Sequence, residues 1–180
     1  MAKLVGKRYA LALFETGLDL NKIDEFDKEL DFIKSVFEEE EDLLKILQHP
    51  KIKKGEKRNL IDSIFKNRVS NEMINFLYII IDKRRERYIL DIVKEYKKLF
   101  NEHENIIEVV ATTAVPMEEK SITRLELVLS NKLNKKVKLI NRVDKTILGG
   151  VLLEIENKLI DGTVLGQLES IGKTIKGISL

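Results

Sequence analysis

Residues 106–115 read IIEVVATTAV, and in this segment the spacing of apolar side chains changes from a period of 3.6 to a period of 2. The segment is rich in β-branched side chains, which favours a β-strand. The alternating positions are Ile107, Val109, Ala111, Thr113 and Val115. The chain is therefore predicted to be helical before this strand and mixed after it.

The N-terminal part shows the spacing of amphipathic helices. Up to Phe100 it contains only three glycines and one proline, and its apolar residues recur on one face of a helix. The clearest stripe is Ile23, Phe26, Leu30, Ile33 and Phe37. Asn21 is the expected N-cap of that helix. Similar stripes recur near Leu60 and Ile89.

Five interruptions divide this part into six predicted helices that end near residue 104. They are expected at residues 18–21, 38–42, 49–55, 67–71 and 83–87. Connections of this length favour a compact antiparallel bundle.

The C-terminal part is predicted to be a small α/β unit. Pro116 begins a helix, a short strand follows near residues 137–140, and a second strand covers residues 151–157. In that second strand apolar and acidic residues alternate, as in a sheet with one wet face. The apolar positions are Val151, Leu153 and Ile155, against Glu154 and Glu156.

The end of the chain is expected to form one more helix. Asn157–Lys158 has the composition of a turn, and Asp161–Gly162 is predicted to open the helix. Its apolar stripe would be Val164, Leu168, Ile171 and Ile175. The predicted fold class is thus α+β, with a six-helix bundle at residues 1–104 and a small α/β domain at residues 105–180.

Composition excludes several classes of function. The 180 residues include 32 basic and 30 acidic side chains, a net charge of +2, and no cysteine. Disulfides, thiolate metal sites and cysteine nucleophiles are therefore excluded, and a reducing cytoplasm is the expected compartment. The longest apolar runs are six residues, whereas a membrane-spanning helix needs about 20. No cofactor and no metal are predicted.

No motif in the chain indicates catalysis. Gly149–Gly150 does not form a phosphate-binding loop, and a bulge or a close backbone approach is expected there instead. Asp144 and Asp161 adjoin turns, where an Asx-type hydrogen bond to the backbone is expected. His49 and His103 are far apart in the sequence, so a histidine metal site is not predicted. His49 is expected to cap a helix end or to be exposed.

Two basic runs, at residues 51–58 and 83–87, are interpreted as solvated loops because acidic residues are interleaved nearby. The alternative is contact with phosphates in a nucleic-acid-binding or regulatory adaptor. No aromatic residue lies within either run to stack on bases, although Tyr88 follows the second. Binding to nucleic acid would weaken steeply with salt.

Two predicted helices are apolar on more than one face. The first carries one stripe of Leu11, Phe14 and Leu18 and a second of Val5, Tyr9, Ala12 and Thr16. The fifth is apolar all round from Met73 to Ile81. Such helices are either central or carry a second contact. The second possibility predicts a groove between helices one and five that accepts an amphipathic helix from a partner.

The sequence resembles the delta subunit of bacterial ATP synthase, the counterpart of the mitochondrial oligomycin-sensitivity-conferring protein. The most specific match is a signature of hydrophobic, acidic and paired-glycine positions, all of which fit. They are Val137, Leu139, Val143, Asp144, Ile147, Gly149, Gly150, Val151, Leu153, Glu154 and Glu156. Further matches lie at residues 8–15, 49–57, 75–96 and 160–168.

Two departures from the family pattern are small. Lys83–Arg84 stands where a glycine or asparagine often precedes the recurrent arginine, here Arg85, and Asp91 stands where proline is common.

The resemblance implies a non-catalytic stator subunit that links the catalytic alpha/beta hexamer to the peripheral stalk. It implies a six-helix bundle that binds the N-terminal helix of an alpha subunit through Tyr9, Ala12, Asn75 and Ile79. The C-terminal domain is implied to engage the b subunits, with one copy in each complex. The implied location is the cytoplasmic face of the cell membrane, which the subunit reaches only through the complex, and no nucleic acid is expected. An enzyme of unknown substrate is the third and weakest alternative.

Overall fold

The fold was described from a computed structural model that covers residues 2–156 and 158–168. Contacts within the chain divide it into two compact units, residues 1–100 and residues 101–180, which we call the helical unit and the α/β unit. The division lies four residues before the boundary expected from the sequence, and helix α6 ends between the two positions, at His103.

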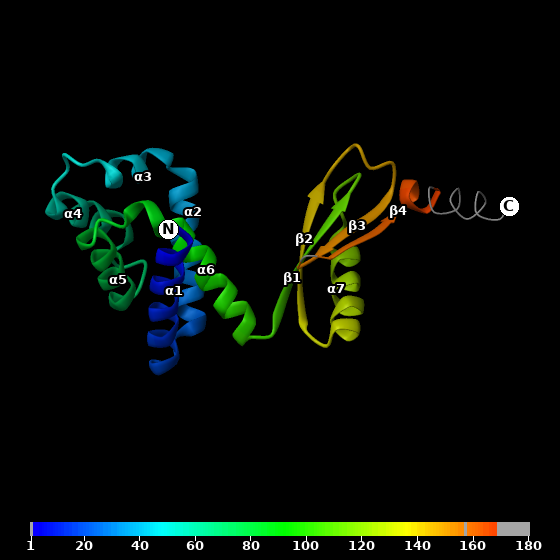
Figure 1. The fold of residues 1–180 in the computed structure, drawn as a ribbon, viewed down its shortest axis with the longest axis horizontal. Coiled ribbons are helices and arrows are strands. Elements are labelled where there is room, and N and C mark those ends of the chain that lie inside the picture. The colour runs from blue at the N-terminus through cyan, green and yellow to red at the C-terminus, as the bar shows by residue number, and fades with distance from the viewer. Residues whose placement is uncertain (1, 157, 169–180) are drawn as a thin grey trace. The chain divides into compact units, whose positions relative to one another are not determined.

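The helical unit contains six α-helices in the described part of the chain (Figure 1). They are α1 (Ala2–Asp19), α2 (Ile23–Glu39), α3 (Glu41–Gln48), α4 (Lys54–Phe65), α5 (Asn71–Asp82) and α6 (Ile89–His103). A short 3-10 helix, η1 (Glu86–Tyr88), precedes α6. The breaks between these helices fall in or next to the five predicted intervals.

The core of the helical unit is aromatic and aliphatic. The predicted stripe of α2 is confirmed, because Phe26, Leu30, Ile33 and Phe37 are buried and Ile23 is half-buried. Other rings close the core between helices. The ring of Phe65 lies 6.0 Å from those of Phe32 and Phe37, and the ring of Phe14 lies 5.7 Å from that of Tyr96.

The predicted N-cap of α2 is wrong. Asn21 has φ 55°, in the left-handed region, and the N-cap position belongs to Lys22 without a capping side chain. Asparagine tolerates left-handed backbone better than most residues, and the backbone N–H of Asn21 donates to the carbonyl of Leu18 at 3.1 Å. Asn21 therefore ends the turn after α1 and does not start α2.

The N-terminus of α5 is held by a long-range contact. The hydroxyl of Ser70 accepts a hydrogen bond from the backbone of Met73 at 3.3 Å and itself donates to Glu29 at 2.9 Å. The backbone N–H of Ser70 also donates to the Glu29 carboxylate. Glu29 is on α2, so one carboxylate fixes where α5 begins.

The α/β unit is a four-stranded sheet with one helix on one face (Figure 1). Its elements are β1 (Ile106–Thr113), α7 (Glu119–Leu133), β2 (Lys136–Val143), β3 (Gly150–Ile155) and β4 (Lys158–Thr163). The strand order is β2-β1-β3-β4. Strands β1 and β2 are parallel and are joined through α7, whereas the other pairs are antiparallel.

The alternation that predicted β1 is confirmed by burial as far as Thr113, whereas Val115 lies beyond the strand and is 68% exposed. Ile107, Val109 and Ala111 are buried, whereas Glu108 between them is exposed. The buried positions join Leu129 of α7 and residues of the other strands in one cluster. This cluster is Ile107, Val109, Ala111, Leu129, Leu139, Leu153 and Ile155.

The prediction for the end of the chain is wrong in one respect. Asp161 and Gly162 do not open a helix but lie within β4, paired with Leu152 and Val151 of β3. The helical residues begin at Val164 and are described to residue 168. Asp–Gly is typical of turns, but here the ladder with β3 determines the conformation. Asn157, Ile171 and Ile175 lie outside the described residues.

Candidate functional site

Helix α1 buries a face made largely of small residues. Gly6, Ala10, Leu13, Phe14 and Gly17 are buried. A Cβ at position 6 would lie 3.3 Å from Asp91 on α6, and one at position 17 would lie 3.1 Å from Ile23 on α2. The two glycines therefore let α1 approach both neighbours closely.

The predicted stripe of Leu11, Phe14 and Leu18 is only partly buried. Phe14 is in the core, but 46% of Leu11 and 40% of Leu18 remain exposed. The reason is that glycine and alanine form much of the buried side of α1, which packs closely against its neighbours. Leu11 and Leu18 lie beside this buried side and not within it.

The second predicted stripe of α1 is exposed in its C-terminal half. Ala12 and Thr16 are exposed, whereas Val5 and Tyr9 are half-buried. The Thr16 hydroxyl donates to the carbonyl of Ala12 at 2.8 Å, so it is turned back onto its own helix.

Helix α5 is buried along most of its apolar surface but keeps a narrow exposed strip. Six of its residues are buried: Met73, Ile74, Phe76, Leu77, Ile80 and Ile81. Asn75 and Ile79 are exposed, and half of the Ile79 surface is accessible. They are one helical turn apart and therefore point the same way.

Helices α1 and α5 are in contact through one aromatic pair. The ring of Tyr9 packs edge-on against the ring of Phe76, with centroids 6.5 Å apart. We call the exposed or half-buried residues Tyr9, Ala12, Asn75 and Ile79 of these two helices the α1–α5 face. None of these four side chains carries a carboxylate, an ammonium or a guanidinium group, so the face suits an apolar partner.

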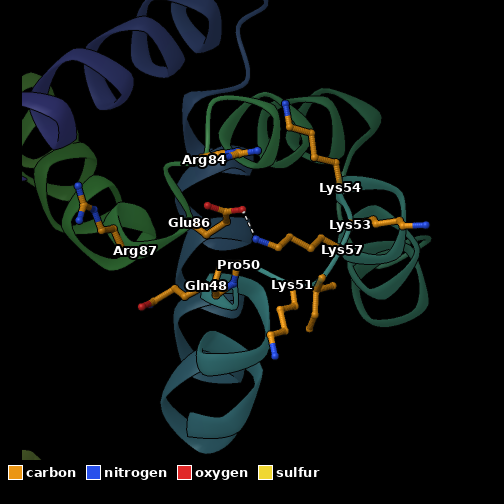
Figure 2. A pocket seen from close by; sticks show the side chains of 10 residues that line it. Gln48, Pro50, Lys51, Lys53, Lys54, Lys57, Arg84, Glu86 and Arg87 are labelled. Carbon is orange, nitrogen blue, oxygen red and sulfur yellow. Dashed lines mark hydrogen bonds and ion pairs between the residues drawn. The ribbon is translucent and has the colours of Figure 1, made fainter.

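The two basic runs are not simply solvated loops. Lys57 is buried, and its ammonium lies 2.8 Å from the carboxylate of Glu86, whose side chain is only 5% exposed. The pair joins α4 to η1 across 29 residues of sequence. Figure 2 shows that side chains of both runs surround the pair. Sequence spacing gave no signal for this contact, because it links two segments far apart in the chain.

The predicted Asx-type hydrogen bonds are present in the α/β unit, at Asp144 after β2 and at Asp161 within β4. Asp144 accepts a hydrogen bond from the backbone of Thr146 at 2.9 Å, and Asp161 accepts one from the backbone of Thr163 at 2.8 Å. These hydrogen bonds lower the pKa of both carboxyl groups. Gly150 has φ 84°, and a Cβ there would lie 2.4 Å from the carbonyl oxygen of Gly162. The close approach predicted for the glycine pair is confirmed.

Histidines and acids do not gather into a metal site within the described residues. His49 is exposed and accepts a hydrogen bond from the backbone of Lys51 at 3.3 Å. The His103 side chain lies 3.4 Å from Glu104. Across residues 2–156 and 158–168, no helix has both the length and the apolar character needed to span a membrane.

Comparison with known proteins gives one consistent result. A family model described as "ATP synthase delta (OSCP) subunit" matches residues 5–175. A protein of Alkaliphilus oremlandii named ATP synthase subunit delta is 46% identical, with 99% of each chain covered. A protein of Clostridioides difficile with the same name is 42% identical, again with 99% of each chain covered. The chain belongs to the ATP synthase delta (OSCP) family.

A solved structure shows the same fold in a distant relative. A chain in the cryo-EM structure of the Toxoplasma gondii mitochondrial ATP synthase hexamer matches with a TM-score of 0.73. The match covers 94% of this chain and 96% of that one at 13% identity, so it bears on the fold alone. As a member of the delta family, the protein is a subunit of an ATP synthase complex whose enzymatic activity resides in other subunits.

Proposed function

We propose that the protein joins the peripheral stalk of the ATP synthase to its catalytic head. Held in this way, the head stays still while the central rotor turns, and ion flow is coupled to ATP synthesis. The helical unit binds the N-terminal helix of an alpha subunit, and the α/β unit engages the b subunits. One copy serves each complex at the cytoplasmic face of the cell membrane, and it takes no part in catalysis.

The α1–α5 face is the observation that supports the alpha-subunit contact. Ala12 is exposed on α1 and Ile79 is exposed on α5, and Tyr9 of α1 packs against Phe76 of α5. Single exposed apolar residues are common on proteins, but here they lie on two helices that are in contact through this ring pair. An amphipathic helix binds such a surface through side chains spaced by helical turns.

A mechanical joint needs slow dissociation, and apolar contacts supply it better than surface charges. A nanomolar complex corresponds to about −12 kcal/mol, which an interface of roughly 1,600 Å² can provide. Exposed ion pairs contribute less than about 1 kcal/mol each. The many lysines and glutamates of the chain are therefore not the main source of affinity in this proposal.

The open face of the sheet supports a second contact on the α/β unit. Helix α7 covers only the face that carries Val109 and Leu139 (Figure 1). On the other face Val110 pairs with Ile140 of β2, which is 43% exposed, and Leu159 of β4 is 66% exposed. A partner that covers these side chains would complete the second layer of the unit.

The alpha-subunit contact can be tested by isothermal titration of the full chain with a peptide of the N-terminal helix of the alpha subunit from the same organism. Ile79→Asp is expected to weaken binding at least about tenfold, because it places a charge in an apolar interface. The matched control is Ile46→Asp on α3, where 43% of the side chain is exposed; it should leave binding unchanged. Equal effects of the two variants would rule out the α1–α5 face as the binding site.

The stalk contact needs a separate experiment, a pull-down with the tagged full chain from membranes of the same organism. Ile79→Asp should lose the alpha subunit while retaining the b subunits, because the two contacts lie on different units. Loss of both sets of subunits together would contradict the proposed division of labour.

A further inference from the structure

A cavity of about 500 Å³ lies where the two basic runs of the helical unit meet (Figure 2). Its volume is in the range of small-molecule sites. The walls come from the connection between α3 and α4, from the first turns of α4 and from the segment that includes η1. The basic residues that line it are Lys51, Lys53, Lys54, Lys57, Arg84 and Arg87.

The charge of this cavity is strongly unbalanced. Glu86 is the only acid in its lining, and that carboxylate is paired with Lys57 at 2.8 Å. The lining therefore keeps five positive charges, although the whole chain has a net charge of only +2. Of two nearby acids, Asp82 pairs with Arg58, whereas Glu56 accepts a hydrogen bond from the backbone of Lys53 and keeps its negative charge.

The buried pair gives the cavity a fixed base. Breaking a buried pair by removing one partner is strongly unfavourable, so Lys57 and Glu86 hold α4 and η1 together. In Figure 2 Arg84 and Lys51 lie on opposite sides of this pair. Lys54 is also fixed, because its ammonium donates to the carbonyl of Asp82 at 2.7 Å.

Arg84 occupies an unfavourable backbone conformation. Its φ is 54°, in the left-handed region where glycine and asparagine are at ease. This conformation ends α5, because the backbone N–H of Arg84 donates to the carbonyl of Ile81 at 3.0 Å and that of Arg85 donates to the carbonyl of Ile80 at 2.9 Å. The helix end leaves an exposed arginine side chain on the cavity wall.

We propose that this cavity binds a compact polyanion of the phosphate class, such as a triphosphate chain, in addition to the role of the protein in the ATP synthase. Guanidinium groups, here those of Arg84 and Arg87, bind phosphate oxygens in pairs, and lysines add point charges.

Other anionic partners fit the cavity less well. Pro50 and Ile52 are the only apolar residues of the lining, so an acidic peptide would find few pockets for its side chains. The lining has no aromatic residue to stack on a nucleic-acid base. The nearby ring of Tyr88 is buried, with the guanidinium of Arg87 4.6 Å from its centroid.

The test is a calorimetric titration of the full chain with tripolyphosphate at about 50 mM and about 150 mM salt. The wild type should bind at both concentrations. Arg84→Asn should weaken binding at least about tenfold, because it removes a two-point contact. Its unfolding temperature should not fall, since asparagine tolerates the left-handed backbone.

Lys83→Asn is the matched control. It removes one positive charge at the neighbouring position, and the Lys83 side chain is exposed and does not line the cavity. It should weaken binding no more than about twofold, through long-range charge alone. Equal losses in the two variants, or no binding by the wild type at about 150 mM salt, would overturn the proposal. Tighter binding of hexaglutamate or oligothymidine than of tripolyphosphate would also overturn it, in favour of a peptide or a nucleic acid.

Discussion

The helical unit and the α/β unit bury their apolar residues to different depths. Of the twelve largest fully buried side chains in the described residues, eleven belong to the helical unit and only Val109 belongs to the α/β unit. A bundle surrounds its central helix on all sides, whereas a sheet covered by one helix has half of its surface open. Within the described residues the helical unit therefore has the more deeply buried core, whereas Ile140 and Leu159 of the sheet remain exposed.

The largest expected effect is truncation of the helical core. Phe65 is fully buried between Phe32 and Phe37, so Phe65→Ala should destabilise the helical unit by about 3–5 kcal/mol. Leu139→Ala, at a position 9% exposed in the α/β unit, should cost nearer about 2 kcal/mol, the lower end for such a change. Hydrogen exchange measured by mass spectrometry would assign each loss to its unit.

Independence of the two units is the feature that this experiment can disprove. Phe65→Ala should leave amide protection in β1 and β3 unchanged. If protection in the sheet fell together with that in the bundle, the two units would unfold as one body.

The second-largest expected effect is on stability, where two glycine substitutions should change the free energy of unfolding in opposite directions. Gly150→Ala should destabilise the α/β unit by about 2–3 kcal/mol, because φ is 84° and the added Cβ would meet the backbone of Gly162 at 2.4 Å. Gly55→Ala should stabilise the helical unit by about 0.5–1 kcal/mol, since Gly55 lies in α4 with nothing within 4 Å of the added atom. Urea denaturation measures both, and a loss of stability from Gly55→Ala would show an unrecognised contact.

The smallest effect is a difference in pH dependence. Burial raises the pKa of Glu29, and the hydrogen bonds from Ser70 offset this only in part. The stability contributed by protonating Glu29 is therefore fully present below the unfolded value of 4.5 and is lost as pH rises through the raised pKa. Because Glu29 is partly solvated, the change should stay below about 1 kcal/mol. Urea midpoints at about pH 4.5 and about pH 7 should differ less in Glu29→Gln than in the wild type.

The α/β unit should respond to acid in the opposite direction. The pKa of Asp144 and of Asp161 is lowered by hydrogen bonds from Thr146 and Thr163. Their contribution is present above the unfolded value of 3.8 and is lost as pH falls through the lowered pKa. A sheet that became more stable on acidification over that interval would contradict this account.

Sequence patterns correctly predicted those helices and strands whose conformation depends on the burial of one face of a single segment. The stripes of α2 and the alternation of β1 were visible because burial of one face leaves a period in the sequence. Strand β4 was missed because Leu159 and Ile160 are adjacent apolar residues on an edge strand and Asp161–Gly162 is typical of a turn. Its conformation depends on pairing with β3, which no local pattern encodes.

Of the two candidate sites, one could be predicted from the sequence and the other could not. Tyr9, Ala12, Asn75 and Ile79 could be proposed from periodicity and family resemblance, because each lies on a regular helix. The cavity between the basic runs could not, because Lys57 and Glu86 meet only after α4 and η1 pack together. A charge run in a sequence shows which residues are basic but not which of them converge.

The contact between Tyr9 and Phe76 has a practical consequence for optical measurements. The chain has no tryptophan, and all four tyrosines and all seven phenylalanines lie within its first 100 residues. Ultraviolet absorbance, tyrosine emission and near-ultraviolet dichroism therefore report on the bundle alone, and the sheet contributes no aromatic signal. Because Tyr9 is half-buried against Phe76, a helix that binds the α1–α5 face should change the tyrosine emission without any added label.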